Sequence, residues 1–179
     1  MMNVLVICGS ARKNSRSRSL TRYVEEYIIE KRINVSTFDM REDMLPIFNG
    51  EEYHHPNVIK LKRMVEEADA LFICTPDYHS GMSGALKNAL DWIGSDQTKG
   101  KVFALSAVAG GGKGGINPLN QLRTVIRGIY GLVIPAQVVL DKRHFSDDPV
   151  LQDPAMTQRI NDVVDEMLFY SSKLRNGTP

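Results

Sequence analysis

The sequence alternates between short apolar runs and longer segments with helical periodicity, and this alternation constrains the fold more than any other feature. The first run, residues 3–8, is continuous in Val, Leu and Ile, as expected for a strand buried on both faces. The next segment carries Leu20, Val24, Tyr27 and Ile28, a spacing typical of a helix with one apolar face. The same alternation of strand-like and helix-like segments continues to residue 174.

Five predicted strands alternate with five predicted helices. We expect strands at residues 3–8, 35–39, 70–75, 102–108 and 132–140, and helices around residues 20–28, 58–67, 86–93, 119–129 and 155–174. Residues 44–56 contain two prolines and an Asn-Gly pair and predict a loop. Strict alternation predicts a parallel sheet with helices on both faces, in either a Rossmann-like or a flavodoxin-like order. Five strands in a short chain favour a three-layer α/β flavodoxin-like fold with strand order 2-1-3-4-5.

Length and composition indicate one globular domain. The chain has 179 residues, of which 42% are hydrophobic and 24% charged. Because domains usually span about 100–200 residues, we expect residues 1–179 to form a single domain. Its 22 Lys and Arg against 21 Asp and Glu give a net charge of +1. Nucleic-acid-binding domains usually carry a strong basic excess, so we expect no nucleic-acid partner.

The apolar runs and the cysteines indicate a cytoplasmic protein. The run at residues 4–7 is too short to span a membrane and lacks a secretory cleavage pattern, so we expect no membrane partner. Cys8 and Cys74 each end an apolar run and predict buried, inert thiols, which suit a reducing cytosol. Neither a CxxC pair nor a Cys/His cluster at zinc spacing occurs, so we expect no bound metal.

Ligands of parallel α/β sheets bind outside the carboxyl ends of the strands, which makes the loops after residues 8, 74 and 108 the expected site. The first loop, residues 9–17, joins a buried strand to a helix N-terminus, where free N–H groups favour a phosphate. Its serines and arginines suit phosphate oxygens, although a solvated turn with an N-cap serine is an open alternative. The loop lacks the ending of a P-loop, which disfavours nucleoside triphosphate hydrolysis.

The second loop, residues 75–84, is longer than most strand-to-helix connections. Pro76 fixes the exit from the strand, and Tyr78 supplies a flat ring. Gly81 and Gly84 permit a close approach of the backbone. For His79 a lining or hydrogen-bonding role is favoured over acid–base catalysis.

The third loop, residues 109–115, holds five glycines in six positions and indicates sharp turns or backbone contact with a ligand. A surface loop without function is one alternative. Another is a dinucleotide-binding Rossmann module, because Gly110, Gly112 and Gly115 match that fingerprint and Asp141 ends the next strand. A Rossmann site normally follows the first strand, and this reading leaves the first two loops unexplained.

These loops together show a family resemblance. The pattern Gly9-Ser10-x-Arg12-x-x-Ser15 resembles the phosphate loop of the NADPH-dependent FMN reductases. Residues 75–79, followed by Gly-x-Leu-Lys-Asn-Ala-Leu-Asp-Trp at 84–92, resemble the second signature of that family. Residues 79–84 and 109–117 are similar to its bacterial azobenzene reductase branch. Ser83 departs from the pattern, because many members carry proline there.

The resemblance implies bound FMN, NADPH as the hydride donor, and ping-pong reduction of azo compounds or quinones. It implies that the FMN phosphate is held by five residues of the first loop, namely Ser10, Arg12, Ser15, Arg16 and Ser17. It implies that the isoalloxazine ring is bordered by Thr75, Pro76, Asp77, Tyr78 and His79, and at its far edge by Gly110, Gly111, Gly112 and Lys113. It also implies that no side chain acts as a catalytic group, since the chemistry is centred on the flavin.

Three further interpretations concern the choice of nucleotide, the rival function and the assembly. Arg16, Arg18 or Lys113 would, by charge alone, favour the 2′-phosphate of NADPH. A flavodoxin-type electron carrier is the main rival, although such carriers are typically acidic to attract their redox partners and this chain is not. The resemblance also implies a homodimer or homotetramer, and apolar residues in the loop at 44–56 offer a surface for it.

Overall fold

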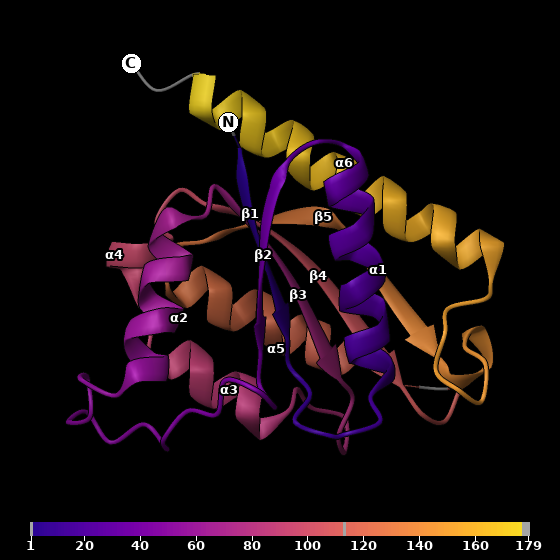
Figure 1. The fold of residues 1–179 in the computed structure, drawn as a ribbon, viewed down its shortest axis with the longest axis horizontal. Helices are drawn as coiled ribbons and strands as arrows, with labels where there is room; N and C mark the ends of the chain where they lie inside the picture. The colour runs from indigo at the N-terminus through magenta and orange to yellow at the C-terminus, as the bar shows by residue number, and fades with distance from the viewer. Residues whose placement is uncertain (1, 113, 177–179) are drawn as a thin grey trace.

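The computed structural model describes residues 2–112 and 114–176, which are built around a five-stranded parallel sheet (Figure 1). The strands are β1 (Asn3–Cys8), β2 (Asn34–Asp39), β3 (Ala70–Pro76), β4 (Val102–Ala109) and β5 (Leu132–Asp141). Their order is β2-β1-β3-β4-β5 and each neighbouring pair is parallel. The predicted flavodoxin-like order is therefore confirmed.

Helices cover both faces of this sheet. Helices α1 (Arg16–Glu30) and α6 (Pro154–Asn176) lie on one face, and α2 (Pro56–Glu67), α3 (Gly84–Asp91) and α5 (Ile116–Gly128) lie on the other (Figure 1). Two short helices were not predicted, α4 (Ser95–Thr98) and a 3₁₀ turn at Lys142–His144. Neither completes two turns, so no apolar periodicity marks it in the sequence.

Caps encoded in the sequence set where two of these helices, α1 and α3, begin. Ser15 Oγ accepts a hydrogen bond from the N–H of Arg18 at 3.3 Å, and Ser83 Oγ accepts one from Leu86 at 3.1 Å. Such caps satisfy backbone donors that have no partner within the helix. The first and second loops therefore turn into α1 and α3 at fixed points.

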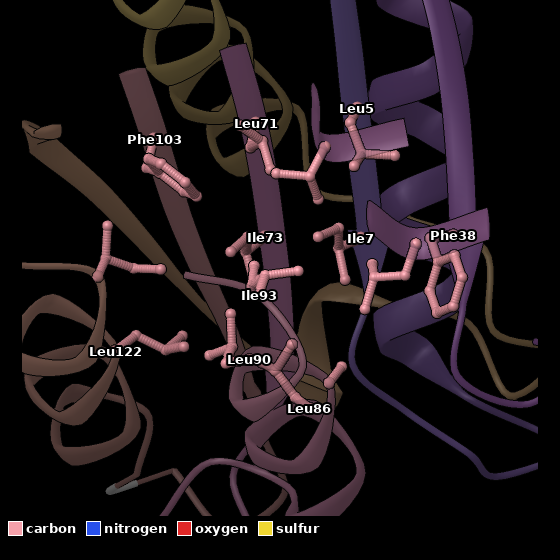
Figure 2. Close-up of a cluster of buried hydrophobic side chains, with 14 of the residues drawn as sticks. Leu5, Ile7, Phe38, Leu71, Ile73, Leu86, Leu90, Ile93, Phe103 and Leu122 are labelled. Carbon is pink, nitrogen blue, oxygen red and sulfur yellow. The ribbon is translucent and has the colours of Figure 1, made fainter. Parts of the chain in front are cut away.

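Two apolar layers hold the helices to the sheet. Because successive strand residues point to opposite faces, Leu5 and Ile7 of β1 face one layer while Val4 and Val6 face the other. Figure 2 shows the first layer, where these side chains meet the buried leucines of α3 and α5. The central strands β1, β3 and β4 are buried almost throughout, which explains why their sequences read as continuous apolar runs.

The two cysteines lie opposite each other in the sheet. Cys8 of β1 and Cys74 of β3 are register partners, and both side chains are fully buried. Burial raises the pKa of Cys8 to about 11 and that of Cys74 to about 12. Both are free thiols, as predicted.

Within residues 2–112 and 114–176, no helix combines the length and the apolar character needed to cross a bilayer. Across the same residues, no group of three or more His, Cys, Asp or Glu side chains is placed to hold a metal ion.

Two glycines near the end of α5 give a test of the packing. A Cβ on Gly131 would lie 2.5 Å from a ring carbon of Phe103 and 2.6 Å from Ile126, whereas a Cβ on Gly128 would meet nothing within 4 Å. We expect Gly131→Ala to lower the free energy of unfolding by about 1–3 kcal/mol through overpacking. Gly128→Ala, inside the helix, should raise it by roughly 0.5–1 kcal/mol. Urea denaturation measures both changes, and equal effects would contradict this packing.

Candidate functional site

The three predicted loops converge on one small cavity at the carboxyl end of the sheet. The cavity has a volume of about 180 Å³. Its lining comes from all three loops and consists of Ser10, Arg12, Asn14, Ser15, Arg16, Ser17, Pro76, Asp77, Tyr78, Val108, Ala109 and Gly110. Whole-ligand pockets usually measure about 300–1,000 Å³, so this cavity matches one part of a larger ligand whose remainder would lie on the open surface.

Some predicted site residues lie next to this cavity rather than on its wall. Thr75 is fully buried at the end of β3, while His79, Gly111 and Gly112 are exposed, and none of the four lines the cavity. Lys113 lies outside the described residues. Nine of the fourteen predicted residues therefore line the cavity. They are all five residues of the first loop, three of the second loop and Gly110 of the third.

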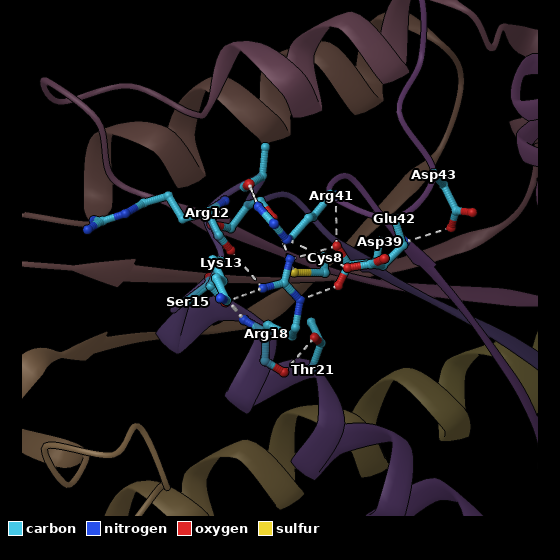
Figure 3. Close-up of polar contacts among 12 residues, drawn as sticks. Cys8, Arg12, Lys13, Ser15, Arg18, Thr21, Asp39, Arg41, Glu42 and Asp43 are labelled. Atoms are coloured by element: carbon cyan, nitrogen blue, oxygen red, sulfur yellow. Dashed lines mark hydrogen bonds and ion pairs between the residues drawn. The ribbon is translucent and has the colours of Figure 1, made fainter.

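Arg18 holds the first loop from behind, and Figure 3 shows its guanidinium at the centre of the contacts. Its Nε and Nη2 bond to the two carboxylate oxygens of Asp39 at 2.5 and 2.8 Å. Nη1 donates to the backbone carbonyls of Arg12 and Lys13 at 2.7 and 3.0 Å, and Nη2 also donates to that of Ser10 at 3.2 Å. A guanidinium has five N–H donors, so every donor of Arg18 has a partner inside the protein.

The pair of Arg18 and Asp39 is ionised at neutral pH. The hydrogen bond to Asp39 raises the pKa of Arg18 above its ordinary value, against the effect of burial. Burial alone would raise the pKa of Asp39, but the hydrogen bonds from Arg18 and from the N–H of Arg41 outweigh it and leave this pKa lowered. The side chains are only 11% and 14% exposed, so water screens the pair weakly.

Arg16 is placed differently, although it belongs to the same loop. Its side chain lines the cavity, and its Nε is buried with no hydrogen-bond partner among the described residues. A buried N–H left without an acceptor costs about 1–3 kcal/mol, more when the group is charged. This orphaned donor, on the first turn of α1, fits a cavity that takes an anionic group such as a phosphate.

The second loop contains a strained turn. His79 and Ser80 have φ values of +54° and +64°, and the backbones of Tyr78 and Gly81 exchange two hydrogen bonds across them. Two positive φ values in the centre indicate a type I′ turn, which usually takes Asn or Gly there. Gln121 of α5 holds the turn, because its Oε1 accepts the N–H of Met82 at 3.1 Å.

Asp77 ties the second loop to the third. Its Oδ1 accepts the N–H of Ser80 at 2.9 Å and its Oδ2 accepts the N–H of Gly115 at 2.6 Å. Gly115 has a φ of +99°, and a Cβ there would lie 2.3 Å from Val139. The glycine at this position is therefore required for both its conformation and its contact.

Ser83 ties the second loop to the first. Its Oγ donates to the carbonyl of Gly9, and its backbone N–H donates to Thr75 Oγ1 at 3.2 Å. Gly9 itself approaches β3 so closely that a Cβ would lie 2.8 Å from the carbonyl oxygen of Cys74. A proline at position 83 would lack both the N–H and the hydroxyl, so Ser83 provides one link to the first loop and one within the second loop.

Asp141 is occupied by contacts within the protein. Its Oδ2 accepts the N–H of Gly112 at 2.5 Å, and its Oδ1 caps the 3₁₀ turn through the N–H of Arg143 at 3.4 Å. The carboxylate that the dinucleotide reading would place on a ribose is thus used to hold the third loop. This geometry does not favour the Rossmann alternative.

Several residues of this network were missed from the sequence. Asn14 lines the cavity, and Asp39 and Gln121 support the loops from β2 and α5. The sequence did carry a signal for Asp39. This carboxylate ends β2, and the neighbouring strand β1 leads into an arginine-rich loop. A larger cavity of about 470 Å³ lies beside Ala11 and the segment after β2, but no predicted site residue lines it.

Comparisons with known proteins found relatives that cover nearly the whole chain. An NADPH azoreductase from Bacillus sp. (strain OY1-2) is 42% identical over 173 residues, covering 96% of this chain and 93% of that protein. An FMN-dependent NADPH-azoreductase from Staphylococcus aureus (strain USA300) is 32% identical, covering 94% and 95%. Among solved structures, a flavoenzyme NAD(P)H:(acceptor) oxidoreductase from Paracoccus denitrificans matches with a TM-score of 0.76 at 21% identity, covering 97% and 98%.

The family model of the NADPH-dependent FMN reductases matches residues 2–145, a range that includes all three loops and the strands that carry them. The resemblance drawn from the loop sequences is confirmed. This chain belongs to the NADPH-dependent FMN reductase family.

Proposed function

We propose that this protein is an FMN-dependent oxidoreductase that takes hydride from NADPH and reduces azo compounds or quinones. The observation that carries the proposal is the cavity where the three loops meet, with Arg16, whose buried Nε has no partner among the described residues, in its lining. The family match and the azoreductase relatives support the same activity. A flavodoxin-type carrier has no comparable support, and the net charge of +1 does not suit one.

In this proposal the first loop holds the phosphate of FMN. The residues that would contact it are Ser10, Arg12, Ser15, Arg16 and Ser17, all of which line the cavity. The N-terminus of α1 adds a partial positive charge at the same place. The donors are therefore present without any rearrangement of the chain.

The second and third loops would border the isoalloxazine ring. Residues 75–79 would lie along one edge, and Gly110–Gly112 with Lys113 along the far edge. When bound, FMN supplies a two-electron carrier between NADPH and the acceptor. The chain's part is to position the ring: Asp77 and Gln121 fix the turn at 78–81, and Tyr78, 37% exposed, offers an aromatic surface for a flat substrate.

The preference for NADPH needs a cation for the 2′-phosphate. Charge alone made Arg18 a candidate for this role. That prediction is wrong, because the five donors of Arg18 are all used within the protein. For Arg16 and Lys113, contact with the 2′-phosphate stays a proposal. One open ring face serving NADPH and then the acceptor implies ping-pong kinetics.

The visible spectrum of the purified full-length protein tests the central proposal. We expect a yellow protein, or one that becomes yellow with added FMN, whose colour bleaches on anaerobic addition of NADPH and returns on addition of an azo dye or a quinone. Boiled protein is the control. A protein that stays colourless with FMN contradicts the proposal, and bleaching that only a partner protein reverses would favour the electron carrier.

Asp77→Ala tests how the loops are joined. The substitution removes acceptors from the N–H groups of Ser80 and Gly115, and hydrogen bonds to a charged group contribute about 1.5–3 kcal/mol each. We expect the affinity for FMN to fall roughly tenfold or more, measured by titration of flavin fluorescence. Asp147→Ala, an exposed carboxylate in another loop, is the matched control. Unchanged affinity in Asp77→Ala would contradict the placement of the ring beside this loop.

We also propose that residues 1–179 form one FMN-binding domain, that the protein is cytoplasmic, and that it forms a homodimer or homotetramer. Two free, buried thiols are compatible with a reducing compartment. The surface for assembly would be the apolar patch of the loop before α2 and of α2 itself, consisting of Met44, Ile47, Phe48, Tyr53 and Ile59, which are 40–84% exposed.

Light scattering tests the assembly. We expect a mass that is a multiple of 20.0 kDa and a shift toward the monomer in Ile47→Asp, because Ile47 is 84% exposed and supports no core. Ile29→Asp, on the outer face of α1, is the control. A wild-type mass near 20 kDa would remove this part of the proposal.

A further inference from the structure

The first loop stands between Arg18 and the cavity. The cavity where the three loops meet is lined by six residues of the loop and the first turn of α1, and Arg18 is not among them. Arg18 instead lines a separate cavity on the other side of the loop, together with Lys13, Thr21 and Asp39. The guanidinium of Arg18 and the cavity wall formed by the first loop therefore lie on opposite sides of the same stretch of backbone.

The hydrogen bonds of Arg18 fix which way three peptide groups point. In a trans peptide the carbonyl of one residue and the N–H of the next point in opposite directions. The carbonyls of Ser10, Arg12 and Lys13 all accept from Arg18. The N–H groups that follow them, those of Ala11, Lys13 and Asn14, consequently point away from the guanidinium, and in the described part of the chain none of the three finds an acceptor.

Free N–H groups on successive residues form a concave site that binds anions. Of the three residues, Asn14 lines the cavity where the loops meet, together with the serines and with Arg16, whose Nε is also unpartnered. Ala11 lines the larger cavity after β2, and Lys13 lines the cavity of Arg18. The loop thus presents its carbonyls to one buried cation and leaves its N–H groups for another ligand (Figure 3).

We propose that Arg18 is a positioning residue for flavin phosphate: it does not touch the phosphate but holds the peptides of residues 10–14, so that the free N–H of Asn14 and the side chains of the loop that line the cavity bind it. The inference rests on the proposed function, since it takes FMN as the ligand of the first loop. It assigns Arg18 a role different from that of Arg12 and Arg16, which the charge pattern alone does not distinguish.

The role requires an arginine with a fixed partner. Asp39, at the end of β2, binds the guanidinium through both oxygens and so sets its plane, which leaves the remaining donors aimed at the loop. A lysine has three donors on a single nitrogen and cannot reach the carboxylate and three carbonyls together. Because Asp39 neutralises Arg18, the pair orients the loop without adding a net charge near the phosphate.

The test compares two ligands that differ only in the phosphate. Flavin-free full-length wild type, Arg18→Lys, and the matched control Arg22→Lys, an exposed arginine one turn along α1, are titrated with FMN and with riboflavin. We expect Arg18→Lys to lose roughly tenfold or more of its affinity for FMN. Its affinity for riboflavin should stay within about twofold of the wild type, because the ring contacts are unchanged. Arg22→Lys should match the wild type with both ligands.

A second variant covers the case in which Arg18→Lys does not fold. Asp39→Asn keeps the size of the side chain but removes one acceptor and the charge, so we expect the same selective loss for FMN in smaller measure. Circular dichroism melting curves establish that the variants compared are folded. An equal loss for FMN and riboflavin indicates general damage and overturns the inference, as does unchanged FMN affinity in either folded variant. A wild type that binds neither flavin overturns the proposed function itself.

Discussion

The ion pair between Arg18 and Asp39 is the contact on which the arrangement of the site depends. It joins the start of α1 to the end of β2, and its remaining donors reach the loop between β1 and α1. Three backbone carbonyls of this loop are held by the guanidinium of Arg18, so the loop takes its shape in part from a charged group behind it. An exposed pair would contribute about 0–1 kcal/mol, but this pair is nearly buried and its loss would leave an unpaired charge.

The other two loops follow the same rule, since each is held by a side chain from elsewhere. Gln121 of α5 holds the turn at 78–81, Asp77 holds Gly115, Asp141 holds Gly112, and Ser83 holds Gly9. None of these groups needs to touch a ligand to matter. They keep three backbone segments at fixed separations, and the cavity where the loops meet depends on those separations.

The sequence predicted the fold well because its signals are local. Runs such as residues 3–8 and 70–75 are apolar throughout since both faces of the central strands are buried, and the edge strand β2 was placed within one residue. Ser15 and Ser83 mark their helix starts in the same local way. The meeting of the three loops at one cavity was also foreseeable, because topology alone decides which strand ends share an edge.

The supporting contacts were beyond the sequence because they join residues far apart in the chain. Arg18 and Asp39 are 21 positions apart, and Gln121 and Met82 are 39 apart. The positive φ values at His79 and Ser80 were hidden for a related reason, since neither residue favours that conformation and only the surrounding contacts impose it. From charge alone, Arg16 and Arg18 were equivalent candidates for binding a phosphate. In the structure Arg16 lines the cavity where the loops meet, whereas Arg18 lines a different cavity behind the first loop.

The burial of Cys8 and Cys74 has a consequence for the durability of such a protein in air. Flavin enzymes working under oxygen generate hydrogen peroxide, and peroxide attacks the thiolate form of cysteine rather than the thiol. Burial raises the pKa of both thiols well above neutral pH, so both side chains are protonated there. The two thiols are thereby protected from such oxidation through protonation as well as through enclosure.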